Sequence, residues 1–183
     1  AKYSKIVHAF EPNPVIFNDI KLNLSKIIKN INFYNFALSD HEKNSILKVP
    51  IRNKDFDRSN YEEYFQMGRA TIHEKNVMGD IETFEIKSKK LDNFTFSNRI
   101  SFIKIDVEGH EMSVIKGAEN TIKQYKPTLL VEIEEKHSKQ KVLDSINYIN
   151  SLGYESFFYD NELKSTNNLN NLNMYNNFIF KPC

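Results

Sequence analysis

Four titratable side chains surround a single glycine in the segment IKIDVEGHE at residues 103–111. They are Asp106, Glu108, His110 and Glu111. The apolar run ISFIKIDV (100–107) predicts a buried strand, and the glycine lets the backbone turn sharply at its end. Because ligands of open α/β sheets bind at the carboxyl ends of strands, Asp106 and Glu108 are expected to project into a ligand crevice. The segment is therefore a candidate catalytic site, with His110 at the start of the next helix.

The same four residues have a plainer interpretation. Acidic residues are favoured in the first turn of a helix, so Glu108 and Glu111 could be helix N-terminal acids, with His110 on the surface. At most two of the four side chains are needed for capping, however. The density of titratable groups therefore favours a functional role for the segment as a whole.

Two further carboxylates, Glu132 and Glu134, occupy alternate positions of TLLVEIE (128–134). Alternate residues of a strand point to the same face, so two like charges would lie together at the strand end. Such a pair needs a cation, a hydrogen-bond donor or a shared proton. Together with Asp106, Glu132 could ligate a divalent metal ion through oxygen. The alternative is an edge strand with solvated acids, against which the apolar run at 129–131 argues.

Glu11 directly follows the β-branched and aromatic run KIVHAF (5–10), which predicts a strand. At the carboxyl end of that strand its carboxylate could accept two hydrogen bonds from ribose hydroxyls, as in many nucleotide-type cofactor sites. The alternative is an acid near the start of the following helix, where the helix dipole favours negative charge. Position alone leaves both interpretations open.

The elements that would position these residues alternate between strand and helix. Asn13 can cap a helix whose first turn contains Pro14, and apolar residues recur at helical spacing up to Asn30. The run INFYNFAL (31–38) then predicts a strand, which completes the strand, helix, strand unit of parallel sheets. Further along, the pattern predicts helices at 110–126 and 142–152 and strands at 128–134, 154–159 and 176–180.

The regular alternation is interrupted between residues 45 and 90, where short strands flank a polar, Tyr-rich stretch. We interpret this segment as a hairpin-like insertion within a single domain at residues 1–183. A loop-rich insertion is a natural element for recognising an acceptor molecule. Its plausible contacts are Tyr61, Tyr64 and Arg69.

Composition excludes several classes of protein. The 183 residues include 25 Lys and Arg against 24 Asp and Glu, so broad electrostatic capture of nucleic acid is not expected. With 14 Phe and 9 Tyr the chain can bury a core, which excludes intrinsic disorder. One cysteine, no run long enough for a membrane span and no visible signal peptide favour a cytoplasmic protein. A glycine-rich loop is excluded from the first 67 residues, which contain no glycine.

In chain order, the strings AFEPNP, NFALSD, GRATI, SFIKIDVEGHE, VIKGA and KPTLLVEIEEKH resemble the FkbM family of S-adenosylmethionine-dependent methyltransferases. The resemblance spans nearly the whole chain and rests on long, uncommon strings. It implies the class I methyltransferase fold, a Rossmann-like α/β domain with a mostly parallel sheet and helices on both faces. It also implies a first strand and a glycine-rich loop upstream of AFEPNP. The chain begins at Ala1 without them, so an N-terminally incomplete domain is expected.

The resemblance also implies roles for individual residues. Glu11 would bind the cofactor ribose, and Pro12 and Asn13 would shape its turn. The residues expected near the adenine are Ala37, Leu38 and Ser39, with no acidic residue before Asp40 to meet the adenine amine. Asp106 would lie beside the methionine part of the cofactor and the acceptor. The acceptor side would be lined by Glu108, His110, Glu132 and Glu134.

The leading hypothesis is methyl transfer from S-adenosylmethionine to a hydroxyl of a sugar, glycolipid or natural product. His110 is the simplest base, while Asp106, Glu132 and Glu134 could orient it, act as bases or hold a divalent metal. The expected partner is a small-molecule or glycan acceptor, with no nucleic acid and no membrane span, and a homo-oligomer is left open. One alternative is a non-catalytic methyltransferase-like binding module or an enzyme fragment that no longer binds the cofactor. Another is a nicotinamide-dependent dehydrogenase, although IKIDVEGHE is not a dehydrogenase pattern.

Overall fold

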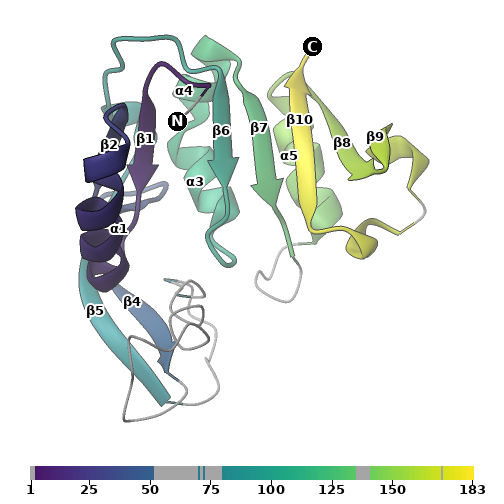
Figure 1. Ribbon diagram of the computed structural model, residues 1–183. Coiled ribbons are helices and arrows are strands. Elements are labelled where there is room, and N and C mark those ends of the chain that lie inside the picture. Colours follow the sequence, from purple (N-terminus) through teal and green to yellow (C-terminus); the bar gives the residue numbers. More distant parts are fainter. Residues whose placement is uncertain (1–2, 52–69, 71, 73–79, 135–140, 170) are drawn as a thin grey trace. The chain divides into compact units, whose positions relative to one another are not determined.

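The computed structural model describes residues 3–51, 70, 72, 80–134, 141–169 and 171–183 (Figure 1). The chain forms two compact units, residues 1–89 and 90–183. Within the described ranges, none of the helices has the length and apolar character that crossing a bilayer requires.

The first unit opens with the predicted strand, helix and parallel strand. These are β1 (Val7–Phe10), α1 (Pro14–Ile27) and β2 (Ile31–Tyr34). β1 and β2 pair in parallel over their full lengths. Asn13 caps α1, because its Oδ1 accepts hydrogen bonds from the backbone N–H groups of Val15 at 3.0 Å and Ile16 at 3.5 Å. The unit and its cap are confirmed, although the helix ends before Asn30.

The second sheet of this unit has three strands in the order β3-β5-β4. They are β3 (Ala37–Leu38), β4 (Lys43–Ile51) and β5 (Asp80–Lys89). β4 and β5 pair antiparallel along their lengths, and β3 runs parallel to β5. The buried residues of this sheet form a hydrophobic cluster, and Val15 and Ile16 of α1 pack against it. The members of the cluster are Ala37, Leu47, Val49 and Ile86.

The single strand predicted at 31–38 is two strands in the structure, so that expectation is corrected. β2 pairs with β1, whereas β3 pairs with β5 in the other sheet. The break falls at Asn35, whose side-chain amide donates to the backbone carbonyls of Glu11 at 2.9 Å and Pro12 at 3.2 Å. These hydrogen bonds tie the end of β2 to the turn after β1, and the chain leaves the first sheet at that point.

The second unit contains a five-stranded sheet in the order β6-β7-β10-β8-β9 (Figure 1). Its strands are β6 (Phe102–Ile105), β7 (Thr128–Glu132), β8 (Tyr154–Asp160), β9 (Glu162–Ser165) and β10 (Asn177–Pro182). β6 and β7 are parallel, and the other three pairings are antiparallel. β7 therefore has a hydrogen-bonded neighbour on each side, which excludes the edge-strand interpretation of its acids.

The helix predicted at 110–126 is divided into α3 (Glu111–Gly117) and α4 (Glu119–Tyr125). The carboxylate of Asp92, in the short 3₁₀ helix η1 (Leu91–Asn93), accepts from the backbone N–H groups of Asn120 at 3.0 Å and Thr121 at 2.8 Å. This carboxylate caps a new helix start, and the low helix propensity of the preceding glycine makes the break inexpensive. The predicted continuous helix is therefore corrected.

The remaining helix of this unit, α5 (Val142–Ser151), ends at Gly153 with φ +87°, as predicted. The hydroxyl of Tyr148 on α5 donates to the carboxylate of Glu119 on α4 at 2.8 Å, so a side-chain hydrogen bond connects the two helices. Two further 3₁₀ helices, η2 (Thr166–Asn168) and η3 (Leu172–Met174), precede β10.

The structure is a mixed α/β fold with several sheets, and the predicted mostly parallel sheet is not what the described residues form. Parallel pairing joins β1 to β2, β3 to β5 and β6 to β7. Antiparallel pairing joins β4 to β5 and places β10 between β7 and β8. Strands that follow one another through tight turns or loops can pair antiparallel without a crossover helix, and periodicity does not reveal that choice.

Candidate functional site

Asp106 and Glu132 follow adjacent parallel strands in the second unit. The β6–β7 ladder places Ile105 opposite Val131, so the next residue of β6 lies beside the last residue of β7. Their side-chain carboxyl groups interact directly, within reach of a hydrogen bond. A hydrogen bond between two carboxyl groups requires one of them to carry a proton. The two strand ends can therefore share a proton while one of the acids is protonated.

The proton belongs mainly to Glu132. Partial burial is the largest cause that raises the pKa of this carboxyl group, and it acts together with the hydrogen bond and negative charge of Asp106. The negative charges of Glu134 and Glu108 add to the effect, and the pKa of Glu132 reaches about 7. Half of the Glu132 side chains are therefore protonated near neutral pH.

Asp106 is held in its ionised form. Its partial burial favours the neutral acid, but hydrogen bonds from Lys104 and Glu132 outweigh burial and lower the pKa of Asp106 below its ordinary value. The Lys104 ammonium nitrogen lies 2.8 Å from Asp106 Oδ2. The two acids of the pair are thus shifted in opposite directions, an arrangement typical of acid and base partners.

The turn after β6 directs further acids to the same place. Glu108 has φ +50° and Gly109 has φ +96°, so two successive residues adopt left-handed backbone conformations. Glu111, which begins α3, is only 5% exposed, and its carboxylate accepts from the backbone N–H of Gly109 at 2.8 Å. Burial raises the pKa of Glu111, although backbone hydrogen bonds oppose it. Its location is that of the helix N-terminal acid considered above.

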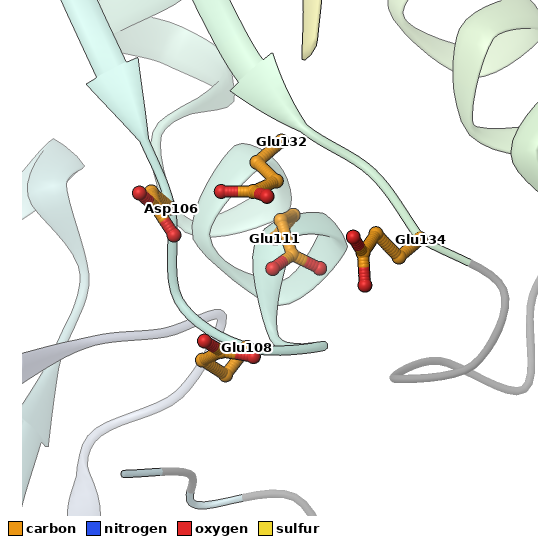
Figure 2. Close-up of a pocket in the computed structure, with 5 residues that line it drawn as sticks. All are labelled: Asp106, Glu108, Glu111, Glu132 and Glu134. Atoms are coloured by element: carbon orange, nitrogen blue, oxygen red, sulfur yellow. The ribbon is translucent and has the colours of Figure 1, made fainter. Parts of the chain in front are cut away.

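Five carboxyl side chains line one small pocket in this unit (Figure 2). They are Asp106, Glu108, Glu111, Glu132 and Glu134. Glu134 also accepts a hydrogen bond from the side-chain amide of Asn176, the residue before β10. The expected convergence of Asp106, Glu108, Glu132 and Glu134 is thus present in the geometry, although their roles stay predictions.

His110 is not among the residues that line this pocket. It stands at the start of α3, and its backbone carbonyl accepts from the N–H groups of Ser113 at 3.1 Å and Val114 at 3.2 Å. The prediction of His110 as the base therefore has weaker geometric support than Asp106. Glu111 belongs to the candidate segment 103–111 but has no assigned role in the sequence analysis, and Lys104 is not among the site residues expected there. Lys104 could have been found from its position two residues before Asp106, on the same face of one strand.

A divalent metal, which the sequence leaves possible, has no ready set of ligands in the part of the chain that the structure describes. There, no three His, Cys, Asp or Glu side chains come together closely enough to hold a metal ion. The pocket acids instead satisfy their charges with a shared proton, Lys104 and backbone or amide donors.

In the first unit, Glu11 lies in the turn between β1 and α1. Its Oε1 accepts from the backbone N–H of Asn13 at 2.8 Å, and partial burial, the larger influence, raises its pKa. Among the described residues the carboxylate has no second hydrogen-bond partner. Its other oxygen can therefore accept from a hydroxyl, which fits a ribose. Asn13 is fully buried beneath the turn, and Pro12 is held by Asn35.

The residues expected near the adenine occupy the end of β3. Ala37 is buried in the hydrophobic cluster of the first unit, and Leu38 is half-buried. Ser39 is fully buried; its backbone N–H donates to the carbonyl of Lys89 at 2.9 Å, and its hydroxyl donates to Asp40 Oδ1 at 3.1 Å. Adenine contacts by these residues stay predictions. Tyr61, Tyr64 and Arg69 lie outside the described residues.

Comparison with known proteins supplies the family. The sequence model of the methyltransferase FkbM domain matches residues 1–156. A crystal structure of methyltransferase FkbM from Methylobacillus flagellatus KT superposes with a TM-score of 0.54 over 97% of this chain, at 17% sequence identity, which shows a shared fold. The chain spans 36% of the length of that protein. No curated protein matches the sequence. The predicted family, a family of enzymes, is confirmed: the chain belongs to the FkbM methyltransferases.

Proposed function

We propose that this protein transfers a methyl group from S-adenosylmethionine to a hydroxyl of a sugar, glycolipid or natural-product acceptor. Family membership supports methyl transfer in general. The observation that carries the proposal is the Asp106–Glu132 pair, because an ionised carboxylate beside a protonated one at parallel strand ends can receive a hydroxyl proton.

Glu11 supports the cofactor part of the proposal. A partly buried carboxylate with one backbone donor and one available oxygen is suited to a neutral diol, whose hydroxyls donate without adding charge. Pro12 and Asn13 keep the carboxylate in place, since Asn35 holds the carbonyl of Pro12 and Asn13 anchors α1. When bound, S-adenosylmethionine supplies a methyl group on a positively charged sulfur and leaves as a neutral thioether.

Asp106 supports the proton transfer. The Asp106 carboxylate would take the proton of the acceptor hydroxyl as the oxygen of that hydroxyl is methylated. The bound cofactor would supply the methyl group and keep the bonding electron pair on its sulfur. Asp106 suits this role because Lys104 keeps it ionised, whereas Glu132 is half protonated near neutral pH. Glu108 and Glu134 extend the polar rim that would receive the acceptor.

The cofactor part is tested by calorimetric titration with S-adenosylhomocysteine. Wild-type protein is expected to bind, and Glu11→Gln is expected to weaken binding about tenfold or more, the effect of one lost charge-assisted hydrogen bond. Glu82→Gln is the matched control, because Glu82 is an exposed acid of the same unit on β5. The titration is run on this chain and on any longer natural form. No binding in either case would contradict the proposal and favour a methyltransferase-like module that binds no cofactor.

The reaction itself is tested by transfer of labelled methyl groups to a panel of free sugars and glycosides. Asp106→Asn is expected to lower kcat by about 10²-fold or more, because the amide cannot receive a proton. Titration of the variant with S-adenosylhomocysteine separates this loss from any loss of its expected contact with the methionine part of the cofactor. Unchanged turnover in Asp106→Asn would rule out this residue as the base, and His110→Gln would then be the next variant. Label appearing on nitrogen instead of oxygen would contradict the acceptor class.

A further inference from the structure

The ion pair between Lys104 and Asp106 does more than neutralise a surface charge. We propose that Lys104 is a positioning residue that keeps Asp106 ionised and so leaves the proton of the Asp106–Glu132 pair on Glu132. The catalytic meaning of this inference rests on the proposed function, but the placement of the proton is a property of the protein alone.

Strand geometry sets up the arrangement. Lys104 and Asp106 are two residues apart in and just after β6, so their side chains point to the same face. Their charged atoms lie 2.8 Å apart. Across the ladder, Lys104 is opposite Leu130, and Glu132 follows two residues later beside Asp106. Asp106 thus has a cation along its own chain and an acid on the neighbouring strand.

The carboxyl groups of Asp106 and Glu132 have different charged neighbours. The groups that act on Glu132 are all acidic: Asp106 at the end of β6, Glu108 in the turn and Glu134 beyond β7. Glu111 of α3 lines the same pocket. Asp106, in contrast, has the Lys104 ammonium group within hydrogen-bond distance. Because two adjacent carboxylates cannot both ionise at low cost, the cation decides which of them keeps the charge.

The same ion pair is too exposed to serve mainly as a stability element. The side chains of Lys104 and Asp106 are 55% and 37% exposed, and ion pairs in such surroundings contribute little to folding. Its influence on the proton is direct, since the negative charge lies beside the ammonium when Glu132 is protonated and away from it when Asp106 is protonated. The expected effect of losing Lys104 is therefore on proton location more than on folding.

The test is carbon-13 NMR of the carboxyl groups of Asp106 and Glu132, measured across pH without cofactor or acceptor. In wild-type protein at about pH 5.5, between the ordinary range of an aspartate and the pKa of Glu132 near 7, Asp106 should show the ionised shift and Glu132 the protonated one. The opposite assignment in wild type would overturn the proposal before any variant is made.

Lys104→Met should move the two carboxyl signals toward each other at that pH, with Asp106 gaining and Glu132 losing protonation. Lys104→Arg should restore the wild-type pattern, because guanidinium retains the positive charge. The matched control is Lys164→Met, which removes another exposed lysine, 2.9 Å from Asp160 in the same unit, and should leave both signals unchanged.

If Lys104→Met leaves Asp106 and Glu132 unchanged, the lysine does not place the proton. If Lys104→Met does not fold, Lys104→Gln removes the same charge with a polar side chain at this exposed position and takes its place in the titration. Failure of S-adenosylhomocysteine to bind would contradict the proposed function and leave this result intact, so the two proposals can fail separately. In the active enzyme, Lys104→Met should also shift the acidic limb of the kcat profile to higher pH, an effect that a purely structural role would not produce.

Discussion

The carboxylate of Glu111 accepts a hydrogen bond from the backbone N–H of Gly109 at 2.8 Å, two residues before it in the chain. This contact closes the left-handed turn at Glu108 and Gly109 and starts α3 from a buried acid. Asp106 lies two residues before Glu108, the first residue of this turn. The backbone that carries the candidate base is therefore shaped by a residue that belongs to the next helix.

Replacing Glu111 by alanine is expected to lower the free energy of unfolding by about 1 to 3 kcal/mol, because a backbone donor in the turn loses its partner. Glu111→Gln retains an oxygen acceptor and should lower the free energy of unfolding by less than Glu111→Ala does. Urea denaturation of both variants measures the difference. Equal losses in the two variants would show that the negative charge, and not the hydrogen bond to Gly109, holds the turn.

Glu132 makes stability depend on pH in a defined direction. The folded protein holds a proton on this residue up to about pH 7, whereas the unfolded chain releases it near the ordinary value of 4.5. Between these values the folded state binds more protons, so the contribution of Glu132 to stability decreases as pH rises from about 4.5 to about 7.

Glu132→Gln is therefore expected to reduce the fall in unfolding free energy over that pH range. Chemical denaturation of wild type and variant at several pH values measures it. Glu155→Gln, at an exposed position of β8, is the control and should leave the slope unchanged. A steeper slope in Glu132→Gln would contradict the direction of the pKa shift.

Asn13 anchors the helix that follows Glu11. Its Oδ1 receives the first two backbone donors of α1, while its fully buried Nδ2 has no hydrogen-bond partner among the described residues. Asn13→Ala is expected to cost about 0.5 to 2 kcal/mol of stability through loss of the cap. Asn13→Ser keeps a capping oxygen and removes the unpaired amide, so it should lower the stability less than Asn13→Ala does. Thermal unfolding of both variants measures the difference. A larger loss for serine than for alanine would refute this account.

Gly153 ends α5 in a conformation that side chains disfavour. Its φ is +87°, and a Cβ added there would lie 2.5 Å from the ammonium nitrogen of Lys126. Gly153→Ala is expected to destabilise the protein by about 1 to 2 kcal/mol from backbone strain, with an added cost from that contact. Adding Lys126→Met to Gly153→Ala should recover only the part due to the contact, as a double-mutant cycle of denaturation midpoints would show. Full recovery would mean that the backbone carries no strain.

Local sequence patterns were sufficient to predict several features of this protein. The strand, helix, strand opening and the Asn13 cap depend on neighbouring residues, and both are present. The glycine at 109 and the acids around it likewise predicted a sharp turn that presents carboxylates after a strand. The family could also be predicted from the sequence, because it contains long, uncommon strings such as AFEPNP and IKIDVEGHE.

Other features depend on contacts between distant residues, and only the folded chain decided them. Asn35 ends β2 by bonding to the turn at Glu11, and Asp92 divides a helix that periodicity alone would continue. The insertion of β10 between β7 and β8 is a choice of partner that strand propensity does not encode. Above all, the raised pKa of Glu132 arises from burial and then from Asp106 on the adjacent strand, neither of which is visible in a list of residue types. Sequence periodicity predicts the face of a strand or helix on which a side chain lies. The protonation state of an acidic side chain depends on its burial and on the charged groups that the fold places next to it.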